Sequence, residues 1–174
     1  MYSKLHVKPR MPEKYRTYSG WVERITIFMA TQKEHSELYN YMKKAYSVNQ
    51  SMCRKYSKIM LLHGDFHHDN ILLSADGSYK IIDPKGVVGD PIFDIPRFIL
   101  NEYNDKRTPE ENFCHTTNTI QLISAGTGLP VEDIQNAFFT EAAMANCWCV
   151  ESGEKPDMDE VKMAYNMMNC PRMY

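Results

Sequence analysis

Two short polar runs, each set against apolar segments, constrain the fold of this chain more than any other feature. The first run spans residues 63–70 and lies between the apolar segments 59–62 and 71–73. The second begins at Asp83, directly after the apolar segment 79–82. Apolar segments this short indicate buried strands rather than helices. Strand ends and tight turns hold side chains at fixed points, so we expect both polar runs to meet on one small sheet.

Helical periodicity dominates the rest of the chain. Apolar residues recur at helical spacing after Ser19, and again from Leu38 onward in a helix that we expect to continue to about Tyr56. The turn residues 75–78 predict a hairpin, and residues 87–91 are expected to form a loop. Four more helices are expected after the strands, in the segments 94–100, 108–126, 134–148 and 157–168. This order predicts an α+β fold that is mostly α-helical.

Three helix starts carry capping signals. Thr31 with Glu34 and Thr108 with Glu111 each fit a capping box, in which a hydroxyl and a carboxylate satisfy free backbone amides at the helix start. Asp157 is expected to begin the last helix in a similar way. Gly126 is expected to end the helix that follows Thr108, because glycine commonly terminates helices.

Composition excludes several classes of protein. The chain has 174 residues, of which 43% are hydrophobic and 24% are charged, as in one soluble globular domain. A formal charge of −2 gives no basic surface for nucleic acid, and no apolar run approaches the roughly 18 residues of a membrane span. The basic, polar N-terminus does not resemble a signal peptide. Five cysteines without a CxxC pair are typical of free thiols, so we expect a cytoplasmic protein.

The two polar runs hold the residue types that phosphoryl transfer requires. This chemistry needs a carboxylate that accepts the proton of the acceptor hydroxyl, and oxygen ligands that hold Mg²⁺ on the phosphates. Asp65 is a candidate for the first task. The amide oxygen of Asn70, five residues later, and the carboxylate of Asp83, thirteen residues after that, are candidates for the second. Protein kinases use this same order of Asp, Asn and Asp around one hairpin.

Other interpretations of these residues remain open. His63, His67 and His68 lie beside aspartates and could form a zinc site, although neither HExxH nor HxHxDH is present. Alternatively, one of the histidines is a hydrogen-bond partner of the loop backbone. Asp90 and Asp94 are explained equally well as helix caps. The paired cysteines of the segment 147–149 fall on different helix faces, which favours packing in the core.

The stretch His63-Gly64-Asp65-Phe66-His67-His68-Asp69-Asn70 resembles the HGDxHxxN signature of the aminoglycoside phosphotransferases and related small-molecule kinases. The segment 82–94, which contains Asp-Pro-Lys-Gly and later Gly-Asp-Pro, is similar to the metal-binding segment of that family. Its Asp-Pro-Lys-Gly form resembles the streptomycin 6-phosphotransferase and hydroxyurea-kinase branch. The resemblance is dense over residues 61–100, and the helices around this region fit the C-terminal lobe of the kinase-like fold.

The resemblance implies roles for individual residues. Asp65 would be the catalytic base, and Asn70 and Asp83 would be the Mg²⁺ ligands. His67 would lie on the phosphate side of the ATP site. Supporting positions around these residues would be occupied by His63, Asp90 and Asp94. The resemblance implies no role for Lys85.

The family also has an N-terminal lobe with a glycine-rich phosphate loop and a strand lysine, and neither pattern occurs in this chain. The segment Ser3-Lys4-Leu5-His6 resembles the part of the family that follows the hinge between the lobes. We therefore expect residues 1–16 to be a lead-in and residues 17–174 to be a kinase-like C-terminal lobe. Such a lobe would expose the apolar floor of its nucleotide cleft, which favours self-association or docking of a complementing N-terminal lobe.

Three hypotheses follow from the sequence. The first is an ATP- and Mg²⁺-dependent kinase lobe that phosphorylates a hydroxyl of a small molecule such as an aminoglycoside. The second is a non-catalytic remnant or binding module of the same fold. The third is a zinc hydrolase, for which we expect no stoichiometric zinc. Neither nucleic acid nor a membrane is an expected partner.

Overall fold

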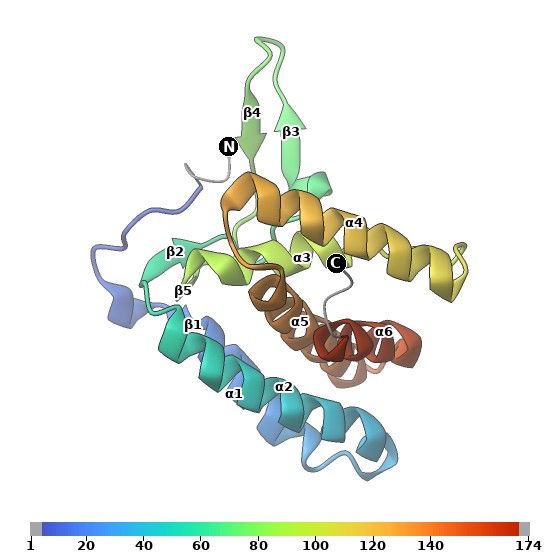
Figure 1. The fold of residues 1–174 in the computed structure, drawn as a ribbon. Helices are drawn as coiled ribbons and strands as arrows, with labels where there is room; N and C mark the ends of the chain where they lie inside the picture. The colour runs from blue at the N-terminus through green and yellow to red at the C-terminus, as the bar shows by residue number, and fades with distance from the viewer. Residues whose placement is uncertain (1–4, 171–174) are drawn as a thin grey trace.

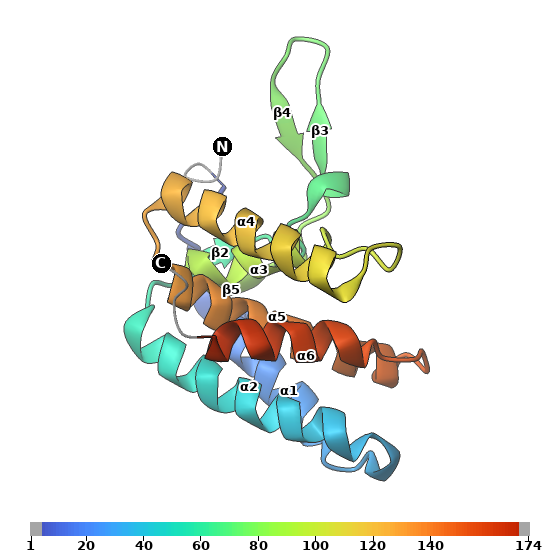
Figure 2. The ribbon, with the colours of Figure 1, turned by 45° about the vertical axis from the view of Figure 1, so that its right-hand side comes forward.

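The computed structural model describes residues 5–170, and these residues form a helical body from which a β-hairpin projects (Figure 1). Turning the molecule by 45° leaves the hairpin clear of the helices (Figure 2). Within the described residues, the helices are α1 (Tyr18–Met29), α2 (Ser36–Lys55), α3 (Ile95–Leu100), α4 (Pro109–Thr127), α5 (Val131–Glu151) and α6 (Met158–Asn169). The strands are β1 (Arg16–Thr17), β2 (Met60–Leu62), β3 (Ile71–Leu73), β4 (Tyr79–Ile81) and β5 (Val87–Gly89).

Helix α5 is the centre of the body, and it packs against α2, α3 and α6. Its sequence explains this position, because small and aromatic residues alternate around the whole helix and not along one stripe. Phe138, Phe139, Ala142 and Ala143 are all fully buried. A helix that is apolar on most sides must be enclosed by others. No helix within residues 5–170 is both long enough and apolar enough to cross a membrane.

The strands form two sheets and not the single sheet that we expected. In the first sheet β5 lies in the middle, parallel to β1 and antiparallel to β2, with Val88 opposite both Thr17 and Leu61. The prediction of a loop over residues 87–91 was therefore wrong for β5. Two buried valines form this strand by pairing with partners far away in the sequence, which local turn signals do not report.

Strands β3 and β4 form the predicted hairpin, with Leu72 opposite Lys80, and its turn is closed by a hydrogen bond from the Ser74 amide to the Ser78 carbonyl. The prediction that these strands are buried was wrong. Leu72 is 47% exposed, Leu73 is 66% exposed and Tyr79 is 61% exposed. A two-stranded hairpin that projects from the body has no layer to cover its apolar faces.

The helix ends confirm some capping predictions and correct others. Thr108 and Glu111 form the predicted capping box, and the Asp157 carboxylate accepts hydrogen bonds from the first amides of α6. The capping box predicted at Thr31 was wrong, because its hydroxyl donates backwards to the Phe28 carbonyl and α2 begins later, after a 3₁₀ turn. Helix α4 also continues past Gly126 and ends at Gly128, which has the left-handed backbone (φ 75°) that favours glycine.

The interface between α5 and α6 contains a buried carboxylate. Glu160 lies on the first turn of α6 and accepts a hydrogen bond of 2.7 Å from the Asn146 amide of α5. Burial raises the pKa of Glu160 to about 7, and the nearby negative charges of Asp157 and Glu141 act in the same direction, while Asn146 and Arg97 oppose the shift. Glu160 therefore makes the fold sensitive to pH between its ordinary value of 4.5 and neutrality.

We predict that Glu160→Gln stabilises the protein at pH 8 and has little effect at pH 4.5. At the lower pH, Glu160 is protonated in the folded chain and about half protonated in the unfolded chain. As the pH rises toward 7, the unfolded chain loses this proton first, so the free energy of unfolding of the unsubstituted protein decreases. Above pH 7 the difference should reach on the order of 2 kcal/mol, or about 4–8 °C in Tm.

Thermal unfolding followed by circular dichroism across this pH range measures the effect. Asp159→Asn is the matched control, since it removes a carboxylate from the same helical turn at an exposed position. Equal shifts in Tm for the two variants at pH 8 would contradict the assignment of the effect to a buried charge.

Candidate active site

The loop that follows β2 carries Asp65 at the meeting point of several elements. One carboxylate oxygen, Oδ1, lies 3.6 Å from Nε of Arg97 on α3. The other, Oδ2, lies 3.6 Å from Nζ of Lys85, which precedes β5. The Asp65 side chain is 24% exposed. The Asp65 carboxylate therefore lies between two cations, with part of its surface open to solvent.

Asp94 fixes the backbone of this loop. Its carboxylate accepts hydrogen bonds from the backbone amides of His63 (2.8 Å) and Gly64 (2.7 Å), and His6 lies 2.9 Å from it. Asp94 directly precedes α3 but its side chain makes no capping bond to that helix. The alternative in which Asp94 is a helix cap is therefore wrong, and its carboxylate instead supports the loop.

Gly64 allows the loop to pass close to the core. Its φ is +76°, and a Cβ atom placed there would lie 2.9 Å from Cγ1 of Val87 and 3.0 Å from Cη2 of Trp21. Any larger residue would face both an unfavourable backbone conformation and a clash. The glycine therefore sets the distance between Asp65 and the strand that carries Val87.

His63 joins the two polar runs. Its ring Nε2 lies 2.8 Å from the carbonyl oxygen of Ile82, and its Nδ1 lies 3.2 Å from the backbone nitrogen of Asp65. These contacts fit a tautomer with the proton on Nε2, which donates to the carbonyl, while Nδ1 accepts from the amide. In addition, the backbone amide of Lys85 donates to the His63 carbonyl at 2.7 Å. His63 is buried, and its contacts join the backbones of the two polar runs.

Asn70 is turned toward the same loop. Its side-chain nitrogen donates to the carbonyl of Asp65 at 2.9 Å and lies 3.1 Å from Nε2 of His67. Both hydrogen bonds of the Asn70 side chain use its nitrogen, so the amide oxygen is left for another partner. His67 also lies 3.8 Å from Oδ1 of Asp65. The structure therefore brings Asp65, His67 and Asn70 together.

Asp83 and Lys85 form the second half of the cluster. Asp83 adopts a left-handed backbone (φ 57°), which is uncommon for a residue other than glycine. Nζ of Lys85 donates to Oδ2 of Asp83 at 3.0 Å, and this hydrogen bond lowers the pKa of Asp83 and raises that of Lys85. Lys85 therefore links Asp83 to Asp65, a connection that the sequence did not indicate.

The donor set suits a cation that is completed by a ligand. Within residues 5–170, no group of three or more histidine, cysteine, aspartate or glutamate side chains is arranged to hold a metal ion. Instead there is one ionised carboxylate, on Asp83, and one free amide oxygen, on Asn70. Mg²⁺ is commonly held by one or two protein oxygens together with phosphate oxygens and water. These two residues fit that pattern.

Asp90 lies further from the cluster, behind β2 and β5. Its carboxylate accepts hydrogen bonds from the amides of Ile92 and Lys58, and it begins a 3₁₀ helix over Pro91–Asp94. The helix-cap interpretation is confirmed for Asp90. Its contribution to the site is to hold the segment from which Asp94 extends.

Sequence reasoning missed the buried side of the site. Nη2 of Arg97 forms an ion pair with Oε1 of Glu141 on α5 at 2.8 Å, and Oε2 of the same glutamate accepts a hydrogen bond from the hydroxyl of Tyr18 on α1 at 2.7 Å. Glu141 is 44 positions from Arg97 and 123 positions from Tyr18 along the chain. Arg97 follows the Gly-Asp-Pro segment closely, but neither of its partners lies in a motif. An isolated glutamate within the apolar sequence of α5 is the only sequence signal that could have found this network.

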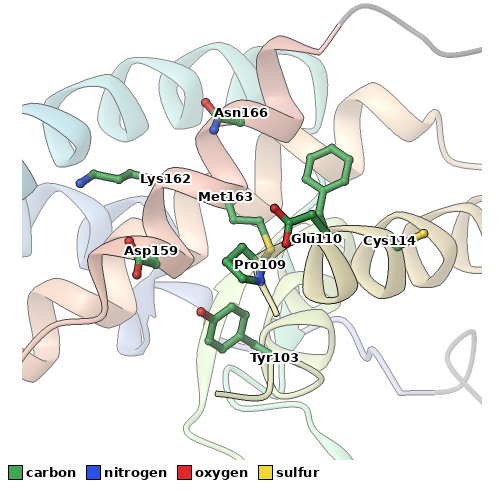
Figure 3. A pocket seen from close by; sticks show the side chains of 9 residues that line it. Tyr103, Pro109, Glu110, Cys114, Asp159, Lys162, Met163 and Asn166 are labelled. Atoms are coloured by element: carbon green, nitrogen blue, oxygen red, sulfur yellow. The ribbon is translucent and has the colours of Figure 1, made fainter. Parts of the chain in front are cut away.

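Two cavities lie near the cluster. One, of about 450 Å³, is lined mostly by apolar residues of the N-terminal segment, β2 and the hairpin, together with His63. The other, of about 520 Å³, lies between α4 and α6 (Figure 3), and it is lined by Tyr103, Pro109, Glu110, Phe113, Cys114, Asp159, Lys162, Met163 and Asn166. Glu102, next to Tyr103, connects the second cavity to the loop of Asp65, because its carboxylate lies 3.3 Å from His68 and 2.9 Å from His115.

Comparison with known proteins places these features in a family. Residues 2–153 match the sequence model of the aminoglycoside/hydroxyurea antibiotic resistance kinases. A streptomycin 3''-kinase from Klebsiella pneumoniae is 25% identical over 111 residues, which are 63% of this chain and 42% of that protein.

The structure is also similar to two crystal structures of LicA. One is in complex with AMP, and the other is described as choline kinase LicA from Streptococcus pneumoniae. The TM-scores are 0.62 and 0.61, each at 15% identity over 97% of this chain. The chain spans 59% of the LicA chains and less than half of the streptomycin kinase. The kinase-like α+β fold is confirmed, and the chain belongs to the aminoglycoside/hydroxyurea antibiotic resistance kinase family.

Proposed function

We propose that this chain is the catalytic-loop lobe of an ATP- and Mg²⁺-dependent kinase, which phosphorylates a hydroxyl group of a small molecule such as an aminoglycoside. The observation that carries the proposal is the position of Asp65. Its carboxylate lies 3.6 Å from Lys85, which also contacts Asp83, and its backbone carbonyl accepts a hydrogen bond from Asn70. Membership of a kinase family supports the same chemistry.

In this proposal Asp65 acts on the acceptor hydroxyl. Its carboxylate accepts the hydroxyl proton as the acceptor oxygen forms a bond to the γ-phosphorus, and the bond between that phosphorus and the leaving oxygen of ADP breaks. The proton stays on Asp65 until product release. The loop geometry supports this assignment, because Asp94 and His63 fix the backbone up to the Asp65 amide and Asn70 bonds to the Asp65 carbonyl.

The phosphate side of the site would be formed by the second polar run. Asn70 and Asp83 would hold Mg²⁺, which neutralises charge on the transferring phosphates when bound. We place His67 beside them on the phosphate side. Lys85 is 45% exposed and bridges Asp65 and Asp83, so it is the cation of this chain that can move to a phosphate oxygen.

The nucleotide base and the acceptor would use the two cavities. The 450 Å³ cavity beside His63 is lined by apolar side chains such as Leu61 and Tyr79, which suit the flat face of a base. The 520 Å³ cavity presents the carboxylates of Glu110 and Asp159, which suit a cationic acceptor (Figure 3).

The domain boundary is part of the proposal. We assign residues 17–174 to the lobe and residues 1–16 to a lead-in. Within the described part of the lead-in, Val7 pairs with Leu61, and Arg16 already belongs to β1. The proposed likeness of residues 3–6 to the segment after the hinge lies partly outside the described residues. A cytoplasmic location is proposed for the protein, and its five cysteines are free thiols.

We predict that Asp65→Asn lowers kcat for phosphorylation of an aminoglycoside by about 100-fold or more, since general bases contribute roughly 10²–10⁴-fold to such rates. Transfer of labelled phosphate from ATP to streptomycin and to a panel of other aminoglycosides measures this loss. Asp69→Asn is the matched control, because Asp69 lies four residues away and its side chain is 88% exposed. Equal activity of the two variants would contradict the role of Asp65.

A non-catalytic remnant or binding module of the same fold is the alternative. The exposed apolar hairpin favours this alternative, because hairpin residues line the 450 Å³ cavity and no other described element covers them. The two proposals differ in nucleotide binding. For the kinase lobe we expect heat and a rise in Tm on titration with Mg-ATP, both weakened in Asp83→Asn. Absence of heat and of a thermal shift would support the remnant.

A further prediction concerns the acceptor. The double substitution Glu110→Gln/Asp159→Asn should raise KM for a polycationic aminoglycoside by about 10-fold with kcat nearly unchanged, because exposed charge pairs contribute roughly 0.2–1 kcal/mol each. Steady-state kinetics at low ionic strength measures the change. Glu23→Gln, an exposed substitution on α1, is the control. An unchanged KM would remove the cavity between α4 and α6 from the acceptor site.

A further inference from the structure

The charged side chain of Arg97 lies on the buried face of the Asp65 loop, and neither the proposed chemistry nor the proposed Mg²⁺ site uses it. Arg97 is 19% exposed, and its partner Glu141 is 3% exposed. Burying an ion pair costs solvation energy, and a pair of apolar residues of similar size would stabilise a core at least as well. A buried pair next to a candidate catalytic residue therefore calls for a functional explanation.

The network runs from the core of the protein to the candidate base. It begins at Tyr18, which stacks on Phe93 with ring centroids 4.7 Å apart, and whose hydroxyl donates to Glu141. Burial, followed by the charge of Glu141, raises the pKa of Tyr18 well above its ordinary value, so the phenol remains a donor. Glu141 in turn holds the guanidinium of Arg97 at 2.8 Å.

The guanidinium has little freedom to turn. Its centre lies 5.6 Å from the ring of Trp148, over the face of that ring, and the ion pair with Glu141 fixes one of its nitrogens. Burial opposes the charge of Arg97, but Glu141 and then Asp65 raise its pKa, so it remains a cation. Its Nε is buried without a hydrogen bond within the described residues, and Oδ1 of Asp65 is 3.6 Å away.

The two oxygens of Asp65 are therefore treated differently. Oδ1 lies beside Arg97, which is buried and fixed by its own partners. Oδ2 lies beside Lys85, which is 45% exposed and donates a hydrogen bond to Asp83. One oxygen is held and the other becomes available when Lys85 moves. This arrangement orients a base toward a substrate while restricting its rotation.

We infer that Arg97 is a positioning residue that holds Oδ1 of Asp65, through a buried network anchored at Glu141 and Tyr18. The inference rests on the proposed function, in which Asp65 is the base. Arginine is required at this position because its planar group can address Glu141 and Asp65 with different nitrogens. A lysine has a single ammonium group for the same two partners.

Kinetics of Arg97 variants test the inference. Arg97→Met should lower kcat by about 100-fold and leave the KM values for ATP and for the acceptor within about 2-fold, because misplacement of a reacting group by about 1 Å has an effect of this size. Arg97→Lys should recover part of the loss, to about 10-fold below the unsubstituted protein. Arg24→Met is the control, since it breaks an exposed Arg–Glu pair between α1 and α5.

A second measurement does not depend on activity. Tm values are compared for Arg97→Met, Asp65→Asn and the double variant, and we expect a departure from additivity of about 2–4 °C. If Arg97→Met does not fold, Arg97→Met/Glu141→Gln removes the unpaired carboxylate and replaces it in the cycle. Additive Tm values, or unchanged kcat in Arg97→Met, would overturn the inference. An inactive unsubstituted protein with non-additive Tm values would reject the proposed function and support the link between Arg97 and Asp65.

Discussion

The two hydrogen bonds that Asp94 accepts from the amides of His63 and Gly64 are the contact on which the rest of the site depends. They join the start of α3 to the loop after β2, two elements that are 30 residues apart. Because a carboxylate that accepts two backbone bonds fixes a turn in position and direction, the location of Asp65 follows from it. Gly64 completes the constraint, since only a residue without a side chain fits against Val87 and Trp21.

His63 connects this fixed turn to the second polar run. Its ring connects the amide of Asp65 to the carbonyl of Ile82, so the left-handed turn at Asp83 is placed relative to the same backbone. The two runs are therefore one unit. The buried ring of His63 therefore couples the positions of the two carboxylates. Both ring nitrogens of His63 contact the backbone, which is the role of a hydrogen-bond partner and not that of a zinc ligand.

The sequence was informative where a feature is local. The Asp65 loop, the hairpin turn at residues 75–78 and the capping box at Thr108 depend on neighbours a few residues away, and all were predicted. Strand β5 and the network behind Arg97 depend on partners that only the tertiary fold brings close, and both were missed. The prediction that β3 and β4 are buried was wrong for a related reason, because the sequence of an apolar strand does not specify whether another layer covers it.

The fold places one cation on the inner side of Asp65 and another cation on its outer side. The inner cation, Arg97, extends from α3 into the space between Glu141 and Trp148, where its position is set by α5. The outer cation, Lys85, sits on a loop that precedes β5 and reaches both Asp65 and Asp83. A largely buried cation lies on one side of the base and an exposed cation lies on the other, so the carboxylate keeps an open side for a substrate. The helical body therefore contributes more than support, since its central helix carries the glutamate that aligns the inner cation.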